Sequence, residues 1–279
     1  MSQALSGKTI VVTGGSSGVG AAAARAFRGQ GATVVITGRS PATTALAAEI
    51  GAEAFGVDFG RLASVRTFAG ELLARHPRID LLVNNVGGIV EGRRLTEDGH
   101  ERTFQVNHLA GFLLTALLRQ RLEACRALVV NTSSMAHHWG KVDLGDLENG
   151  AAYSPMAAYG AAKRMNILHA MELGRRYPGV TGVSFHPGVV ASGFAREGSA
   201  VMRWFYGSLL LRPFLRTPEQ GADTLVWLAT AAPGRDFEAG GFYVDRRPGR
   251  VNGQVTPALA GALWDASERL LGLASAKVA

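Results

Sequence analysis

The feature that most limits the fold is a succession of short β-branched runs, each followed by a helical pattern. The expected strands are residues 9–13, 33–37, 52–57 and 79–84, and helices are expected at residues 21–30, 43–50 and 61–75. Strands and helices that alternate in this way form a parallel sheet with helices on both faces. Further strands at 127–130, 181–185 and 241–244 predict one doubly wound α/β domain over residues 1–279, with about seven strands.

The first strand leads into a glycine-rich loop, Gly14-Gly-Ser-Ser-Gly18-Val-Gly20, and then into an alanine-rich helix. Glycines let backbone N–H groups approach a pyrophosphate, and the N-terminus of the helix adds a partial positive charge. The spacing differs by one residue from the common dinucleotide fingerprint, but strand, loop and helix together predict a phosphate cradle.

The second strand ends in Gly38-Arg39-Ser40, where the adenosine ribose of a dinucleotide would lie. An NAD site usually has a carboxylate at this point, whereas arginine suits a 2′-phosphate. The sequence therefore predicts NADP(H) in preference to NAD(H). The alternative is a surface arginine in a turn.

Polar residues also follow the other strands. Asp58 closes the third strand, Asn84–Gly88 the fourth, Asn131–Ser134 the fifth and His186–Val190 the sixth. Ligands of parallel sheets bind outside these carboxyl ends. A long helix expected over 98–123 carries Asn107, which is either a hydrogen-bonded core amide or a site residue.

Tyr159 and Lys163 are four residues apart in a helical segment and so project from the same face. An ammonium near a phenol favours the phenolate, so the pair could supply the proton donor that reduction of a carbonyl needs. An ordinary amphipathic helix would produce the same spacing by chance.

Composition argues against several partners. The net charge of +7 is spread over scattered basic residues, which fits a solvated surface and an anionic cofactor better than nucleic acid. The single Cys125 fits a reducing cytoplasm. The adjacent His137 and His138 diverge and match no metal spacing, so no metal is expected. No uncharged apolar run reaches eighteen residues, so no integral membrane segment is expected, and the chain is assigned to the cytoplasm.

Residues 193–215 are unusually rich in large apolar side chains, among them Trp204 and Phe205. The segment follows the sixth strand, so we expect a substrate lid over a lipophilic site. Burial against a partner subunit and shallow docking on an anionic membrane are the alternatives. A C-terminal helix is expected over residues 256–271.

Together these motifs resemble the short-chain dehydrogenase/reductase family, which has a Rossmann fold, over nearly the whole chain. The motifs are Thr13-Gly14-x-x-x-Gly18-x-Gly20, Asp58, Asn84-Asn85-x-Gly87, Asn107, Ser134, Tyr159-x-x-x-Lys163 and Pro187-Gly188. The retinol-dehydrogenase-like branch is the most similar, through residues 129–138, Met202-Arg-Trp, Thr217-Pro-Glu-Gln-Gly-Ala and Gly241-Phe-Tyr-Val-Asp. Val86 and Ser192 stand where the family usually has alanine and threonine.

The resemblance implies hydride transfer between a nicotinamide and an alcohol or carbonyl carbon. It implies that Tyr159 is the acid or base, that Lys163 lowers its pKa and holds the ribose, that Ser134 binds the substrate oxygen and that Asn107 holds a relay water. The cofactor-binding residues would be Gly14, Ser16, Ser17, Gly18, Val19, Gly20, Arg39, Asp58, Phe59, Asn85, Val86, Gly87, Tyr159, Lys163, Pro187, Gly188, Val189 and Ser192. Substrate contacts are expected from His138, Trp139, Phe194, Trp204 and Phe205.

The expected function is therefore an NADP-dependent oxidoreductase that acts on a lipophilic alcohol, ketone or aldehyde. A homo-oligomer is left open. A catalytically silent NADP(H)-binding sensor or scaffold would use the same fold, and a nucleotide- or methyl-donor-binding transferase would explain only the glycine loop.

Overall fold

The computed structural model describes residues 3–190 and 215–273 of the chain, and within them it has an eight-stranded sheet. The strand order is β3-β2-β1-β4-β5-β6-β7-β8. The strands are β1 (Thr9–Val12), β2 (Thr33–Gly38), β3 (Glu53–Gly56), β4 (Leu81–Asn84), β5 (Leu128–Thr132), β6 (Thr181–His186), β7 (Phe242–Val244) and β8 (Arg247–Pro248). Each pairing is parallel except that of β7 with β8, which extends the predicted parallel sheet by a two-residue antiparallel edge.

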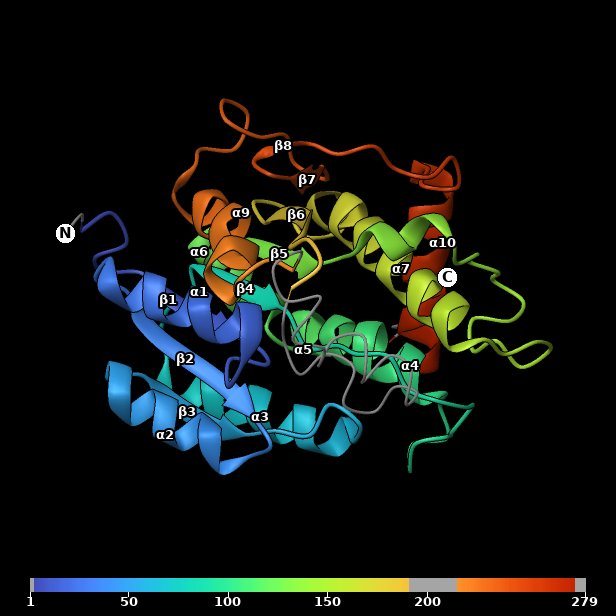
Figure 1. The fold of residues 1–279 in the computed structure, drawn as a ribbon, viewed down its shortest axis with the longest axis horizontal. Coiled ribbons are helices and arrows are strands. Elements are labelled where there is room, and N and C mark those ends of the chain that lie inside the picture. Colours follow the sequence, from blue (N-terminus) through green and yellow to red (C-terminus); the bar gives the residue numbers. More distant parts are fainter. Residues whose placement is uncertain (1–2, 191–214, 274–279) are drawn as a thin grey trace, which may run out of the picture.

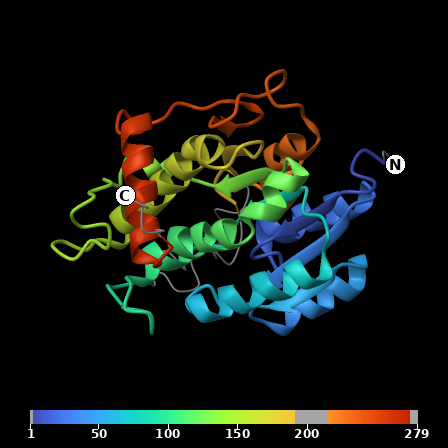
Figure 2. The same cartoon turned by 180° about the vertical axis from the view of Figure 1, so that it is seen from behind.

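Helices cover both faces of the sheet, as the alternation of strands and helices predicts (Figures 1 and 2). The helices that precede β5 are α1 (Gly18–Gly29), α2 (Pro41–Ile50), α3 (Leu62–Arg75), α4 (Arg102–Phe104), α5 (Ala110–Leu117) and α6 (Arg119–Cys125). Those that follow β5 are α7 (Pro155–Arg176), α9 (Pro218–Thr230) and α10 (Pro257–Leu270). A short 3-10 helix, η2 (Met135–His138), follows β5 directly.

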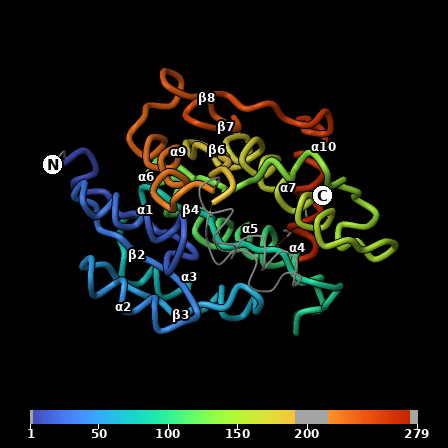
Figure 3. Tube along the Cα trace, in the orientation of Figure 1, coloured from blue at the N-terminus to red at the C-terminus, as the bar shows by residue number. Residues whose placement is uncertain are grey.

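Consecutive side chains of β1 enter two different hydrophobic cores, because strand residues alternate between faces. Ile10 and Val12 pack with α1 and α9 on one face. Val11 packs on the other face with α3, α5, α7 and α10, the face that Figure 2 presents. The tube in Figure 3 can be followed from β1 at one side of the molecule to α10 at the other. The sheet is therefore buried on both sides, and its strand ends are where a ligand can be bound.

The helix expected over 98–123 is interrupted. It begins at Arg102, because the carboxylate of Glu101 accepts hydrogen bonds from Thr103 N and Phe104 N, the first free N–H groups. A π-helical turn, η1 (Gln105–Leu109), then precedes α5. Such a turn shifts the side chains that follow, and it places Asn107 toward the carboxyl end of β4.

None of the helices in the described part of the chain combines the length and hydrophobicity that a membrane crossing requires.

Candidate active site

A cavity of about 710 Å³ lies along the carboxyl ends of the parallel strands. Its size is within the range of small-molecule and cofactor sites. One end is bordered by Ser16, Arg39 and Ser40, and the other by Ser134 and Tyr159. The predicted cofactor residues that border it are Gly14, Ser16, Ser17, Gly18, Val19, Arg39, Asp58, Phe59, Asn85, Val86, Gly87, Tyr159, Lys163, Pro187, Gly188 and Val189.

The glycine loop is folded tightly against itself. Gly14 has a φ of 65°, in the left-handed region that favours glycine. A Cβ on Gly20 would overlap the carbonyl oxygen of Gly14 and lie 2.8 Å from Asn85 Nδ2. Gly20 is buried and does not border the cavity among the described residues, so it acts by allowing α1 to approach the loop. The N-terminus of the twelve-residue α1, which opens at Gly18, is thus held at the cavity, where it can bind a phosphate.

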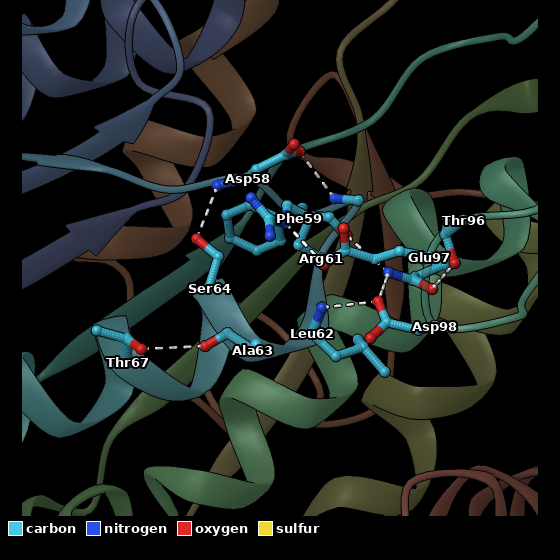
Figure 4. Close-up of polar contacts among 12 residues, drawn as sticks. Asp58, Phe59, Arg61, Leu62, Ala63, Ser64, Thr67, Thr96, Glu97 and Asp98 are labelled. Carbon is cyan, nitrogen blue, oxygen red and sulfur yellow. Dashed lines mark hydrogen bonds and ion pairs between the residues drawn. The ribbon is translucent and has the colours of Figure 1, made fainter.

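Arg39 lies at the adenosine end of the cavity, with Asp58 beside it. Arg39 Nη1 is 3.7 Å from Asp58 Oδ1, and both side chains are partly exposed. Figure 4 shows how Asp58 is held: its N–H donates to Ser64 Oγ at 3.1 Å, and its Oδ1 accepts from Gly60 N at 2.9 Å. The backbone of Asp58 is therefore held by α3 and its carboxylate by Gly60, which places the carboxylate beside the arginine.

Asn85 joins the ends of three strands. Its Nδ2 donates to Thr13 O at 3.0 Å, its N–H donates to Thr13 Oγ1 at 2.8 Å, and its Oδ1 accepts from Thr132 Oγ1 at 3.2 Å. Thr13 Oγ1 also donates to Val83 O. These bonds hold β1, β4 and β5 in register under the floor of the cavity.

Tyr159 and Lys163 project from the same face of α7, as their spacing predicts. Tyr159 is 5% exposed, and Lys163 Nζ lies 5.4 Å from the centre of its ring. Lys163 Nζ donates to the carbonyl of Thr132 at 3.3 Å. Burial lowers the pKa of Lys163 to about 7, since the charged form loses its hydration. The side-chain nitrogen can therefore gain or release a proton near neutral pH.

The two adjacent serines after β5 have different surroundings. Ser133 is buried, and its Oγ donates to Lys163 O at 2.7 Å. Ser134 borders the cavity, and its Oγ accepts from Ala136 N at 3.2 Å, capping η2. Its hydroxyl proton remains available to a substrate oxygen.

Asn107 lies behind the cavity wall and borders a second, water-sized space of about 10 Å³. Its side chain bonds both backbone groups of Gly88: Oδ1 accepts from Gly88 N at 3.0 Å, and Nδ2 donates to Gly88 O at 2.9 Å. A Cβ on Gly87 would lie 2.5 Å from Asn107 Oδ1 and 2.7 Å from Lys163 Nζ. The loop after β4 therefore passes between Asn107 and Lys163.

The end of the cavity near Tyr159 is apolar. Ile89, Ala136 and Met156 pack with Tyr159, while Met135 and Trp139 border the cavity and are well exposed. His138, expected as a substrate contact, does not border the cavity among the described residues; the centre of its ring lies 4.0 Å from that of His137, with the two rings tilted by 38°. Ser192, Phe194, Trp204, Phe205 and residues 193–214 of the expected lid lie outside the described residues.

Several residues at the site were missed from the sequence. Arg102, Met135 and Met156 border the cavity, and Asn166 bonds the carbonyl that Lys163 also contacts. His186, which the sequence placed at a strand end without a role, also borders the cavity. Asn166 could have been found, because it is three residues after Lys163 and hence on the same helix face. Nothing in the sequence pointed to Arg102, because the helix that begins at this residue was expected to begin at residue 98. Over residues 3–190 and 215–273, no three His, Cys, Asp or Glu side chains come together as metal ligands would.

Comparison with known proteins identifies the class. The model of the short chain dehydrogenase family matches residues 8–201. The chain is 45% identical over 277 residues to a Streptomyces sp. (strain C5) protein provisionally named daunorubicin C-13 ketoreductase DnrU, covering 96% of this chain and 94% of that protein. It is 36% identical over 281 residues to human (Homo sapiens) retinol dehydrogenase 11, covering 96% and 87% of the two chains.

Two solved structures are also similar to this chain over most of its length. A Mycobacterium Paratuberculosis protein described as uncharacterized has a TM-score of 0.76 and 31% identity, and the match covers 96% of this chain and 94% of that one. A metagenomic short-chain oxidoreductase in complex with NADP has a TM-score of 0.62 and 28% identity, covering 85% and 96%. The chain belongs to the short-chain dehydrogenase/reductase family of oxidoreductases. Within that family it falls in the retinol-dehydrogenase-like branch.

Proposed function

We propose that the protein is an NADP(H)-dependent oxidoreductase that interconverts a lipophilic alcohol and the corresponding ketone or aldehyde. The observation that carries the proposal is the arrangement at the Tyr159 end of the cavity. A phenol, a buried ammonium and a serine hydroxyl there border the same apolar space.

The proposed roles follow from this geometry. The nicotinamide, when bound, supplies or accepts the hydride, and the protein supplies orientation and protons. Tyr159 gives its phenolic proton to the developing alkoxide in reduction and takes it back in oxidation. Ser134 Oγ donates a hydrogen bond to the same oxygen. Lys163, whose pKa burial lowers to about 7, holds a proton close to the Tyr159 ring. Asn107 keeps Gly87 and Gly88 against Lys163.

The preference for NADP(H) rests on the adenosine end of the cavity. Arg39 is the cation after β2, and the hydroxyls of Ser16 and Ser40 border the same part of the cavity. The stretch Gly38–Ser40 contains no acid that would bind a 2′-hydroxyl and repel a 2′-phosphate. The NADP in the related metagenomic structure is consistent with this choice.

The lipophilic substrate is proposed from the wall near Tyr159. Met135 (40% exposed), Trp139 (68%) and Val189 (47%) are large apolar side chains that border the cavity and remain open to solvent. Apolar surface exposed beside a site is typical of a binding surface. The names of the relatives add two substrate types to test, a polycyclic ketone and a retinoid.

The test is turnover of a panel of lipophilic ketones and aldehydes, including daunorubicin and retinal, followed by oxidation of NADPH. Tyr159→Phe removes only the hydroxyl, so we expect cofactor binding to survive while turnover falls by about 10² or more. Equal turnover in the two proteins would refute the role of Tyr159. Binding of NADPH without turnover of any carbonyl would favour the sensor or scaffold instead.

A further inference from the structure

A group of buried polar side chains lies behind Lys163, on the side away from the cavity. Asn166 on α7 and His108 on η1 are its centre, with exposed fractions of 5% and 1%. Asn166 follows Lys163 by three residues, so both side chains project from one face of α7 toward the end of β5.

The amide of Asn166 contacts two backbone carbonyls at once. Its Nδ2 is 3.0 Å from Thr132 O and 3.0 Å from Asn107 O. Thr132 O is the same oxygen to which Lys163 Nζ donates, at 3.3 Å. One side chain therefore holds the hydrogen-bond acceptor of the lysine and the backbone of the neighbouring asparagine.

The identity of the two contacted atoms determines the orientation of the amide. Only an NH₂ group can face two carbonyl oxygens, so the Asn166 oxygen must face His108. His108 Nδ1 lies 3.2 Å from Asn166 Oδ1 and, because that oxygen has no proton, must be the donor. Burial lowers the pKa of His108 to about 4, so the ring stays neutral with its proton on Nδ1. Ser267 Oγ donates to the carbonyl of Leu263 at 2.9 Å and lies 3.4 Å from His108 Nε2.

We propose that Asn166 is a positioning residue for Lys163: its amide, oriented by His108, fixes the Thr132 carbonyl that accepts from the ammonium, together with the backbone carbonyl of Asn107. Only the expected effect of Asn166 on catalysis rests on the proposed function; its effect on the titration of Lys163 does not. Within the described residues, the ionisable groups near Lys163 are Tyr159 on α7 and His108 on η1, and His169 on α7 lies beyond His108.

The decisive test is the titration of Lys163 in the protein without cofactor, followed by NMR of lysine labelled at Cε. Asn166→Leu removes the amide, so the Thr132 carbonyl is no longer held in place by it. The charged form of Lys163 then loses a fixed acceptor while it remains buried, so we expect its pKa to fall by about half a unit or more. An unchanged or raised pKa would overturn the proposal.

The control is Thr115→Val. Thr115 is equally buried and accepts a hydrogen bond from Asn84, but it contacts neither Thr132 nor Asn107. We expect this variant to lose stability without moving the lysine titration. The same shift in both variants would show a general structural effect and refute the positioning role.

A second pair keeps the test decisive if Asn166→Leu does not fold. His108→Asn retains an N–H near the position of Nδ1, whereas His108→Leu has no donor. We expect the lysine titration to be preserved in the first and shifted in the second. The same titration in both, whether shifted or not, would overturn the proposal.

Turnover separates this proposal from the proposed function. With an accepted carbonyl, Asn166→Leu should lower kcat by about tenfold, with a change below about twofold in the Kd for NADPH. If the wild type reduces no carbonyl, the proposed function fails, while the lysine titration still decides the role of Asn166.

Discussion

Gly87 shows how closely single residues are constrained at this site. The space where a Cβ would stand is occupied by Asn107 Oδ1, at 2.5 Å, and Lys163 Nζ, at 2.7 Å. Neither neighbour can retreat easily, because Asn107 is bonded to Gly88 and Lys163 is buried. A methyl group here must therefore move one of the two side chains.

Gly87→Ala tests this constraint. We expect the protein to fold and kcat to fall by about 10²-fold, the usual effect of displacing a positioned group by about 1 Å. The control is Gly70→Ala on the exposed side of α3, where an added Cβ would have no neighbouring atom within 4 Å. Turnover by the Gly87 variant equal to that of the Gly70 variant would show that Lys163 and Asn107 tolerate the displacement.

Arg39 is the residue that should decide cofactor choice. A charge-assisted hydrogen bond to a 2′-phosphate is worth about 1.5–3 kcal/mol, or roughly ten- to hundredfold in affinity. We expect Arg39→Asp to lose that preference for NADPH over NADH, as measured by the two Kd values. Arg25→Asp makes the same charge change on α1, where Arg25 pairs with Glu49, and should leave the ratio unaltered. Equal binding of NADH and NADPH by the wild type would contradict the proposal.

At the scale of elements, α10 closes the face of the sheet that carries α5 and α7. Trp264, 2% exposed, is its main contact, with ring centres 4.8 Å from Phe112, 5.1 Å from Tyr177 and 5.5 Å from His169. Arg176 on α7 also bonds Asp265 at 2.7 Å. The helix thus backs α7, the element that presents Tyr159 and Lys163.

Trp264→Ala should therefore destabilise the whole face. We expect a loss of about 3–5 kcal/mol in the free energy of unfolding, the usual cost of a large aromatic cavity, measured by urea denaturation. Leu270→Ala, on the same helix with 40% exposure, should cost far less. A loss below about 1 kcal/mol for Trp264 would mean that α10 contributes little to the fold.

At the scale of the molecule, three buried histidines couple stability to pH. Burial lowers the pKa of His108 to about 4, that of His169 to about 3 and that of His186 to about 4. Below pH 6.5 the unfolded chain binds protons at these residues and the folded chain does not. The free energy of unfolding must therefore decrease as the pH falls from 6.5 toward 4.

We expect a loss of at least about 2 kcal/mol between pH 7 and pH 5, a window that lies above the range in which carboxylates titrate. Denaturation at each pH measures the slope. His169→Phe should make the slope shallower, and replacement of the partly exposed His138 by Gln is the control. A stability that does not change over this window would show that the buried histidines are protonated without cost.

Local pattern was sufficient for the order of the elements and for most of the residues that border the cavity. These predictions depend on residues close together in the sequence. The β-branched runs predict the parallel sheet, the spacing of the glycines predicts the glycine loop, and the spacing of Tyr159 and Lys163 predicts their shared face on α7. The short antiparallel β8 and the break of the 98–123 helix were not predicted, because a two-residue pairing and a π-helical turn leave no periodic trace.

The sequence by itself determined which strand ends carry polar groups, since strand direction and residue order suffice for that. Only the tertiary structure gave the physical basis for choosing Ser134: Ser133 is bonded to the backbone of α7, whereas Ser134 borders the cavity. Only the tertiary structure shows that His138 does not border the cavity formed by the described residues and that Asn166 contacts Thr132, 34 residues away in the chain. Such contacts join segments far apart in sequence, and their geometry depends on how whole helices pack on the sheet.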